Sequence, residues 1–256
     1  MTKRKYFNKK CKLSSKYLRI THWNIGGIIS DNYGNKFEDP DFLKLINGED
    51  IIAITETHIG EHDKLSIPGY VVKRKVRKKS RKAKKYSGGI ALIVKKELES
   101  SIEILKSKSD NILWSKIKCS DGGNDFLLGT VYISPLNSTY SKNVLCNQFK
   151  TWEILTEEIA FYKSKYRIGL VGDFNARTGT LPDYIINDDG RYVGLPDNYI
   201  PDIDIISRAN SDLIVNKFGK QLIELCCMSG IRIVNGRKIG DSMGKKHVMN
   251  GMAAVL

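Results

Sequence analysis

Four apolar segments of this chain share one layout, and this repeated layout constrains the fold more than any other feature of the sequence. Each segment is a short run of aliphatic and β-branched residues that ends in a polar residue and a turn: LRITHWNIGG (18–27), IIAITETH (51–58), LLGTVYISP (127–135) and IGLVGDFN (168–175). Runs of this length, bounded by glycine or proline, predict buried β-strands. In α/β proteins reactive groups gather beyond one edge of the sheet, so the four polar strand ends predict one shared site.

The strand ends place five polar side chains on predicted loops, namely Asn24, Glu56, Tyr132, Asp173 and Asn175. Taken singly, each has a purely structural explanation. Asn24 before a glycine pair and Asp173 after Gly172 could simply form turns, and Glu56 could be a surface carboxylate. Only the combination of these residues in one chain favours a catalytic centre.

Helix patterns lie between and after these strands. The further elements that we expect are helices over 149–162 and 215–225, strands over 87–94 (SGGIALIV) and 231–236 (IRIVNG), and a long loop over 183–207. In both helices the apolar residues recur every three or four positions, which is typical of a helix with one face in the core. Ser141 or Asn143 is the expected N-cap of the first helix, and Gly230 the expected C-cap of the second.

Positive charge is concentrated in one place. The 256 residues carry a formal charge of +14, and residues 73–85 (KRKVRKKSRKAKK) contain ten cations and no anion. These cations are Lys73, Arg74, Lys75, Arg77, Lys78, Lys79, Arg81, Lys82, Lys84 and Lys85. Such a run predicts a solvated loop. The functional alternative is an arm that contacts nucleic-acid phosphates, or a nuclear localisation sequence.

Several classes of protein are excluded. The longest apolar stretches, residues 51–54 and 90–94, fall far short of the roughly 18 residues of a membrane span. The basic N-terminus is followed by polar residues where a signal peptide has its apolar segment. Five scattered cysteines without a Cys-x-x-Cys motif indicate neither a disulfide framework nor a zinc site. We therefore expect an intracellular protein with reduced thiols and no disulfide-linked partner.

The order of the motifs resembles the endonuclease/exonuclease/phosphatase superfamily, and within it the endonuclease domains of LINE-type (non-LTR) retrotransposons. The stretches that carry the resemblance are HWNIGG, ITETH, SGGIALIV, VYISP, GDFNARTG and IVNGRKIGD. The resemblance implies an α/β fold, a four-layer sandwich of two packed β-sheets flanked by helices. We divide the chain into a basic N-terminal extension (1–17), an incomplete domain of this family (18–241) and an aberrant tail (242–256).

The resemblance also implies roles for the five polar residues. Glu56 would be the main Mg²⁺ ligand with support from Asn24, and Mn²⁺ can substitute for Mg²⁺, an ion that accepts few protein carboxylates and keeps several waters. Asp173 would orient and deprotonate the attacking water. Asn175 and Tyr132 would donate hydrogen bonds to the scissile phosphate. The substrate would be DNA, nicked by hydrolysis, in the nucleus.

The chain departs from the family pattern after Asp241. The pattern continues to Gly-Ser-Ser-x-x-Asp-Tyr and to Ser-Asp-His, and no histidine of this chain follows an aspartate. His22 and His58, beside Asn24 and Glu56, are expected to point elsewhere and receive no role. Residues 246–255 can be written in codons that, read two bases later, resemble the family's next motif. We therefore expect a frameshift, loss of the last strands and impaired activity.

Two rival functions stay open. The chain could be a catalytically inactive remnant that binds nucleic acid without cutting it. It could also be a phosphatase or phospholipid phosphodiesterase of the same superfamily, although the ten-cation run favours DNA over a small phosphomonoester. The resemblance makes a past fusion to a reverse transcriptase plausible.

Overall fold

The structure is a computed structural model. It describes residues 17–30, 34–79, 83–119, 124–136, 138, 147–188, 199, 201–203 and 205–237, with the side chains of 147–149 left out. The tail at 242–256, all but residue 17 of the N-terminal extension, and the expected N-caps Ser141 and Asn143 lie outside the described residues.

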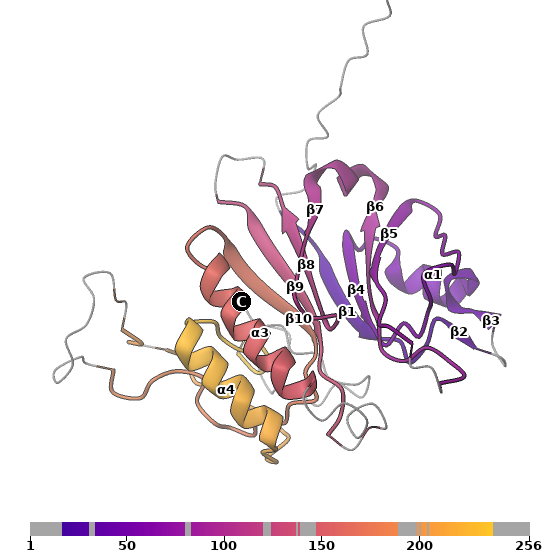
Figure 1. The fold of residues 1–256 in the computed structure, drawn as a ribbon. Coiled ribbons are helices and arrows are strands. Elements are labelled where there is room, and N and C mark those ends of the chain that lie inside the picture. The colour runs from indigo at the N-terminus through magenta and orange to yellow at the C-terminus, as the bar shows by residue number, and fades with distance from the viewer. Residues whose placement is uncertain are drawn as a thin grey trace, which may run out of the picture.

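Two four-stranded sheets face each other (Figure 1). The first has the order β1 (Ile20–Asn24), β4 (Ile51–Thr55), β6 (Ile90–Lys95) and β5 (Tyr70–Lys75). The second has the order β10 (Arg167–Asp173), β9 (Phe126–Tyr132), β8 (Ile112–Ile117) and β7 (Ile102–Leu105). Both sheets follow one scheme, because the first pair of strands is parallel and the other two pairs are antiparallel.

Helices cover the outer faces of both sheets. In Figure 1, α1 (Pro40–Ile46) lies on the first sheet, whereas α3 (Asn147–Tyr162) and α4 (Lys217–Ser229) lie on the second. Short elements complete the described part: β2 (Ile29–Ser30) paired with β3 (Gly34–Asn35), and the 3₁₀ helices η1 (Lys36–Glu38) and η2 (Lys96–Ser101). Together the layers form the four-layer α/β sandwich that the sequence predicts.

The central strand β4 is almost entirely apolar because both of its faces are buried. In β4, Ile51 and Ala53 point into the cluster between the two sheets, whereas Ile52 and Ile54 belong to the cluster under α1. A third cluster joins the second sheet to α3 and α4 around Trp114. A strand with alternate residues in two cores has no polar face, which explains why these segments read as continuous apolar runs.

Local sequence sets the helix ends. The Asp39 side chain accepts a hydrogen bond from the Asp41 backbone, and Pro40 occupies the first turn of α1. Asn216 caps α4 by accepting from the Gly219 backbone N–H, and Gly230 ends the helix in the left-handed conformation with φ 77°. The predicted C-cap at Gly230 is therefore confirmed.

One expected strand is wrong. Residues 231–236 form no named strand in the described part of the chain, and a turn occupies its last positions. Ile231 and Ile233 are buried in the cluster that joins the second sheet to α3 and α4. Ile233 forms an isolated bridge only, and its backbone N–H donates to Asp183 Oδ2 at 2.6 Å.

Candidate active site

Four strand ends from both sheets meet at one place. Asn24 is the last residue of β1 and Glu56 directly follows β4, while Tyr132 ends β9 and Asp173 ends β10. Asn175 lies two residues beyond Asp173. Three of these residues thus belong to strands, not to the loops that the sequence suggested. The sheets bring together all five, because β1 and β4 pack against β10 and β9 across the sandwich.

A single amide nitrogen joins the two carboxylates. Asn24 Nδ2 donates to Glu56 Oε1 at 3.0 Å and to Asp173 Oδ2 at 2.7 Å. The Tyr132 hydroxyl donates to the same Glu56 oxygen at 2.9 Å. Hydrogen bonds to a charged oxygen are short and strong, and they fix its orientation. The first sheet's Glu56 is therefore held by one donor from each sheet.

The backbone is strained where it presents these groups. Glu56 has φ 55° and Asn175 has φ 47°, in a region that residues other than glycine rarely adopt. The Gly27 N–H donates to the Glu56 carbonyl at 2.7 Å, and the Asn175 N–H donates to Asp173 Oδ1 at 3.0 Å. Strain of this kind persists only where surrounding contacts over-determine the conformation, and it is enriched at functional sites.

Asp173 has the environment of a base. Asp173 is 5% exposed, and its burial raises the pKa of its carboxyl above the usual value. The nearby Glu56 carboxylate also raises this pKa, whereas the hydrogen bonds from Asn175 and Asn24 lower it. A raised pKa makes a carboxylate a better proton acceptor near neutral pH. Oδ1 and Oδ2 each accept one hydrogen bond from these donors, which leaves lone pairs for a water molecule.

Tyr132 and Asn175 were expected to donate hydrogen bonds to a phosphate, but both already donate hydrogen bonds within the protein. The hydroxyl proton of Tyr132 is used on Glu56, and burial, followed by the Glu56 charge, raises the pKa of Tyr132. Asn175 Nδ2 donates to the Ile133 carbonyl at 2.7 Å, which leaves the second amide hydrogen for another acceptor. In this geometry Tyr132 orients Glu56, and Asn175 has one remaining donor.

The donor set at Glu56 fits a divalent cation that keeps most of its water. Among the described residues there is no group of three or more histidine, cysteine or acidic side chains that could enclose a metal. The second carboxylate oxygen, Glu56 Oε2, faces His58 Nε2 at 3.7 Å, beyond hydrogen-bond distance, and the Glu56 side chain is 23% exposed. Asn24 turns its amide nitrogen toward Glu56, and its amide oxygen accepts from the Gly26 backbone N–H at 3.2 Å. Glu56 Oε2 is therefore the oxygen left for a cation, and a single protein carboxylate suits Mg²⁺, which keeps several waters.

His58 is a residue that sequence reasoning missed. The expectation that it points away from the site is wrong, because its Nε2 faces Glu56 Oε2. The expectation assumed strand geometry, but Glu56 and His58 both have positive φ, which breaks the strand alternation. Burial lowers the pKa of His58, against the opposing effect of the Glu56 carboxylate.

His22, in contrast, lies away from the site as expected. Its Nε2 is 3.1 Å from Thr55 Oγ1, and burial lowers the pKa of His22 to about 4.

The basic segment is not a solvated loop along its whole length. Lys73, Arg74 and Lys75 belong to the edge strand β5. Lys73 pairs with Glu99 at 2.9 Å, and Lys75 Nζ donates to the Ser107 and Ile112 carbonyls at 3.3 and 3.1 Å. Long basic side chains can cover apolar surface with their stems while the charged end reaches a polar partner, which is how a strand accommodates them.

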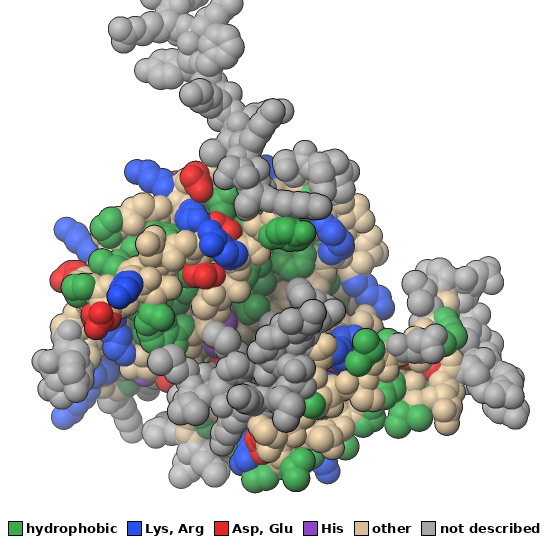
Figure 2. Space-filling view, turned by 180° about the vertical axis from the view of Figure 1, so that it is seen from behind, with side chains coloured by type: hydrophobic (Ala, Val, Ile, Leu, Met, Phe, Trp, Pro, Cys, Tyr) green, Lys and Arg blue, Asp and Glu red, His purple; other side chains and the backbone are tan. Residues whose placement is uncertain are grey.

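The exposed cations come after this strand. Lys78, Lys79, Lys84 and Lys85 are exposed, and Arg81 and Lys82 lie outside the described residues. On the face shown in Figure 2, lysine and arginine side chains are interspersed with acidic ones. The described cations on that face therefore form no continuous basic patch.

Arg77 is the exception within the basic segment, because it is only 4% exposed. Its Cζ lies 5.3 Å from the centroid of the Tyr132 ring, and NH2 donates to Ser134 Oγ at 3.2 Å and to Asn111 Oδ1. Sequence reasoning placed Arg77 with the phosphate-contacting lysines. The feature of the sequence that accompanies this burial is the Gly88-Gly89 pair. A Cβ at Gly88 would lie 2.5 Å from the guanidinium carbon, so a glycine is needed there for Arg77 to be buried.

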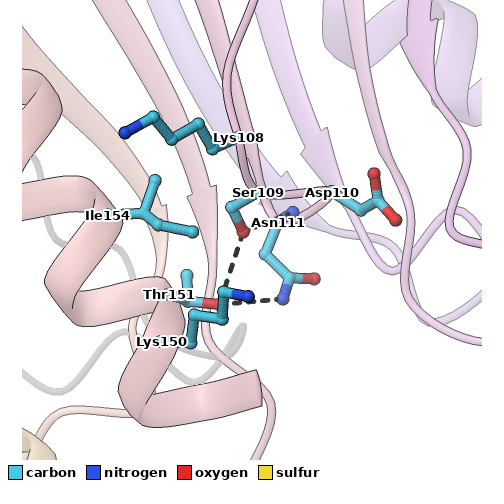
Figure 3. Close-up of a pocket in the computed structure, with 7 residues that line it drawn as sticks. All are labelled: Lys108, Ser109, Asp110, Asn111, Lys150, Thr151 and Ile154. Carbon is cyan, nitrogen blue, oxygen red and sulfur yellow. Dashed lines mark hydrogen bonds between the residues drawn. The ribbon is translucent and has the colours of Figure 1, made fainter. Parts of the chain in front are cut away.

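A polar cavity of about 130 Å³ lies between the turn before β8 and the first turns of α3 (Figure 3). It is lined by Lys108, Ser109, Asp110, Asn111, Lys150, Thr151 and Ile154. Thr151 Oγ1 accepts from Asn111 Nδ2 at 3.2 Å and lies 3.4 Å from Ser109 Oγ. The polar groups at the floor of this cavity are thus bonded to one another, and through Asn111 to Arg77.

The sequence matches the model of one protein family. The match covers residues 21–197, more than half of the chain, and the model describes the endonuclease/exonuclease/phosphatase family. The chain belongs to this family. All five predicted site residues fall within the matched region, and enzymes of the family include nucleases and phosphatases that generally use divalent metal ions. A comparison with curated proteins returns no match.

Solved structures of several nucleases and phosphatases are similar to this chain at low sequence identity. An AP endonuclease from Archaeoglobus fulgidus is 13% identical with a TM-score of 0.46, over 93% of this chain and 86% of that one. The endonuclease domain of TRAS1, a telomere-specific non-LTR retrotransposon, is 12% identical with a TM-score of 0.47, over 93% and 84%.

The 3′ phosphatase NExo from Neisseria, bound to a product DNA hairpin, is 15% identical with a TM-score of 0.42, over 64% of this chain. The match spans 60% of the length of that phosphatase.

The helices in the described part of the chain are too short or too polar to span a membrane.

Proposed function

We propose that this chain is a Mg²⁺-dependent phosphodiesterase that nicks DNA, an endonuclease of the retrotransposon type. The observation that carries the proposal is the bridge that Asn24 Nδ2 forms between Glu56 and Asp173, the second of which lies 149 residues from Asn24 in the chain. A metal-binding carboxylate and a buried base meet there on the open edge of two sheets. The exposed lysines at 78, 79, 84 and 85 favour a polyanionic substrate.

Each residue has a task in this proposal. Glu56 would hold the cation, which would supply positive charge to the phosphate when bound, and Asn24 would orient the Glu56 carboxylate. Asp173 would orient a water molecule and accept its proton, for which its raised pKa suits it. The free amide hydrogen of Asn175 would donate to a phosphate oxygen, and Tyr132 would keep Glu56 in place.

The test is nicking of supercoiled plasmid by the purified chain in Mg²⁺, with parallel reactions in Mn²⁺ and in EDTA. We expect nicking that EDTA abolishes and that Glu56→Ala reduces by at least about 100-fold, since the loss of a positioned catalytic group costs this much or more. Glu97→Ala is the matched control, because Glu97 is an exposed carboxylate on η2 outside the site.

Two outcomes would contradict the proposal. Equal nicking by the wild type and Glu56→Ala would exclude Glu56 as the metal ligand and point to a contaminating nuclease. No nicking, together with DNA binding that weakens with salt, would identify the chain as an inactive nucleic-acid-binding protein.

A further inference from the structure

A buried arginine, Arg77, packs against Tyr132 of the candidate active site. Arg77 is 4% exposed, and transferring a guanidinium from water into a protein costs several kcal/mol unless its donors are satisfied. Its NH2 group donates to two neutral acceptors, the Asn111 amide oxygen and the Ser134 hydroxyl. The fold thus holds a positive charge at this position although nearby lysines of the same segment reach solvent.

The guanidinium packs over the ring of Tyr132. The distance of 5.3 Å from Cζ to the ring centroid lies within the range of a cation–π contact. Gly88 also packs against the guanidinium, because a Cβ there would lie 2.5–2.8 Å from three guanidinium atoms and the missing side chain makes room for them. Arg77 therefore contacts both Gly88 and the Tyr132 ring, and its packing limits the movement of that ring.

The partners of Arg77 also hold the chain on either side of Tyr132. The Tyr132 backbone N–H donates to the Asn111 carbonyl at 3.0 Å, so Asn111 contacts both Tyr132 and Arg77. Ser134 follows Tyr132 by two residues and is 3% exposed. Asn111 is in turn fixed by Thr151 of α3, at the cavity of Figure 3. This places Arg77 in a chain of contacts from α3 to the hydroxyl that bonds Glu56.

We propose that Arg77 is a positioning residue of the active site, which holds the Tyr132 ring so that its hydroxyl stays on Glu56 Oε1. The effect of Arg77 on catalysis rests on the proposed function. Its effect on the position of the Tyr132 ring depends only on the contacts between the two residues. Arg77 is thereby separated from the exposed lysines of the same segment, which would contact substrate.

The first test follows the Tyr132 ring directly and needs no activity. In the full chain labelled with ¹³C in its tyrosine rings, the Tyr132 signal is assigned from its loss in Tyr132→Phe. We expect Arg77→Met to shift or broaden this signal. Arg208→Met is the matched control, because Arg208 is another buried arginine, 8% exposed, whose NH2 bonds Thr178 and two carbonyls.

The second test is a double-mutant cycle on nicking. Arg77→Met should lower kcat by about 10- to 100-fold with little change in KM, since a small misplacement of a catalytic group has effects of this size. In the Tyr132→Phe background the same substitution should cost less than about twofold, because the hydroxyl that Arg77 positions is already absent. Arg77→Lys, which retains the charge, should restore part of the rate.

The outcomes separate the two proposals. A Tyr132 signal that is unchanged in folded Arg77→Met, or effects that multiply fully in the double variant, would overturn the positioning role. A wild-type chain that does not nick DNA would overturn the proposed function, and the ring signal would then decide the positioning role alone. If Arg77→Met does not fold, Arg77→Lys replaces it in both measurements, with the same expected direction.

Discussion

At the scale of single residues, Gly172 decides how closely Asp173 and its strand approach their neighbours. It precedes Asp173 on β10, pairs with Val131 of β9 and has φ 151°. A Cβ at this position would lie 1.9 Å from the Val131 carbonyl oxygen, which no side-chain movement can relieve. The glycine before Asp173 is therefore required by the backbone of the neighbouring strand and not only by a turn.

We predict that Gly172→Ala lowers the free energy of unfolding by about 3 kcal/mol or more, because backbone must move to relieve the clash. Gly230→Ala is the control. Gly230 also has positive φ, but no atom lies within 4 Å of its added Cβ, so only the conformational cost of about 1–2 kcal/mol applies. Urea unfolding of both variants measures the difference, and equal destabilisation would show that the clash with Val131 is unimportant.

At the scale of elements, a buried carboxylate joins the segment after β10 to the segment after α4. Asp183 is fully buried and makes two hydrogen bonds with the Arg237 guanidinium, at 2.7 and 3.0 Å, besides the one from the Ile233 backbone. Burial alone would raise the pKa of Asp183, but Arg237 and the Ile233 N–H hold it below its usual value. The ion pair thus ties the two segments together.

We predict that Asp183→Asn costs about 3–5 kcal/mol of stability at pH 7, since it leaves Arg237 buried without its charge partner. Because the folded pKa of Asp183 is lowered, its contribution is complete above the unfolded pKa near 4 and decreases as the pH falls through the folded value.

The wild type should therefore lose stability below about pH 4 more steeply than Asp183→Asn. Asp212→Asn is the control, because the Arg177–Asp212 pair is partly exposed, screened by solvent and should contribute much less to stability. Urea unfolding at several pH values tests this, and parallel curves for wild type and Asp183→Asn would contradict it.

At the scale of the whole molecule, the described cations of the basic segment divide into buried or paired side chains and exposed ones. The first cations of the basic segment bond to the protein itself, and Arg77 is buried beneath Tyr132. The exposed lysines at 78 and 79 directly follow Arg77 in the chain. Electrostatic contact with a substrate should accordingly depend on these lysines near the site more than on the total charge.

We predict that the double substitution Lys78→Gln and Lys79→Gln flattens the slope of log K against log salt for duplex DNA, by about 0.9 for each phosphate that the variant no longer neutralises. Lys163→Gln with Lys165→Gln removes the same charge just before Arg167, at the opposite end of β10 from Asp173. That control should leave the slope almost unchanged. Equal flattening by both pairs would mean that only net charge matters.

The sequence predicted much of the fold because its central strands bury both faces. The strands at Ile51–Thr55 and Ile90–Lys95 are short, nearly continuous apolar runs. β5 was not predicted, because its last three residues are basic and every residue in it is half-buried. The strand expected at 231–236 was predicted from apolar residues that in fact bury against a helix layer and bond to Asp183.

The sequence by itself determined which side chains stand at the strand ends, because local β-propensity and turn residues decide where each strand stops. Only the tertiary structure decided what those side chains contact. The bond from Asn24 to Asp173 joins two sheets, the positive φ of Glu56 turns His58 toward it, and Gly88 leaves the space that buries Arg77. The first of these contacts joins residues 149 positions apart, and the other two depend on backbone conformations and packing that no apolar pattern in the sequence predicts.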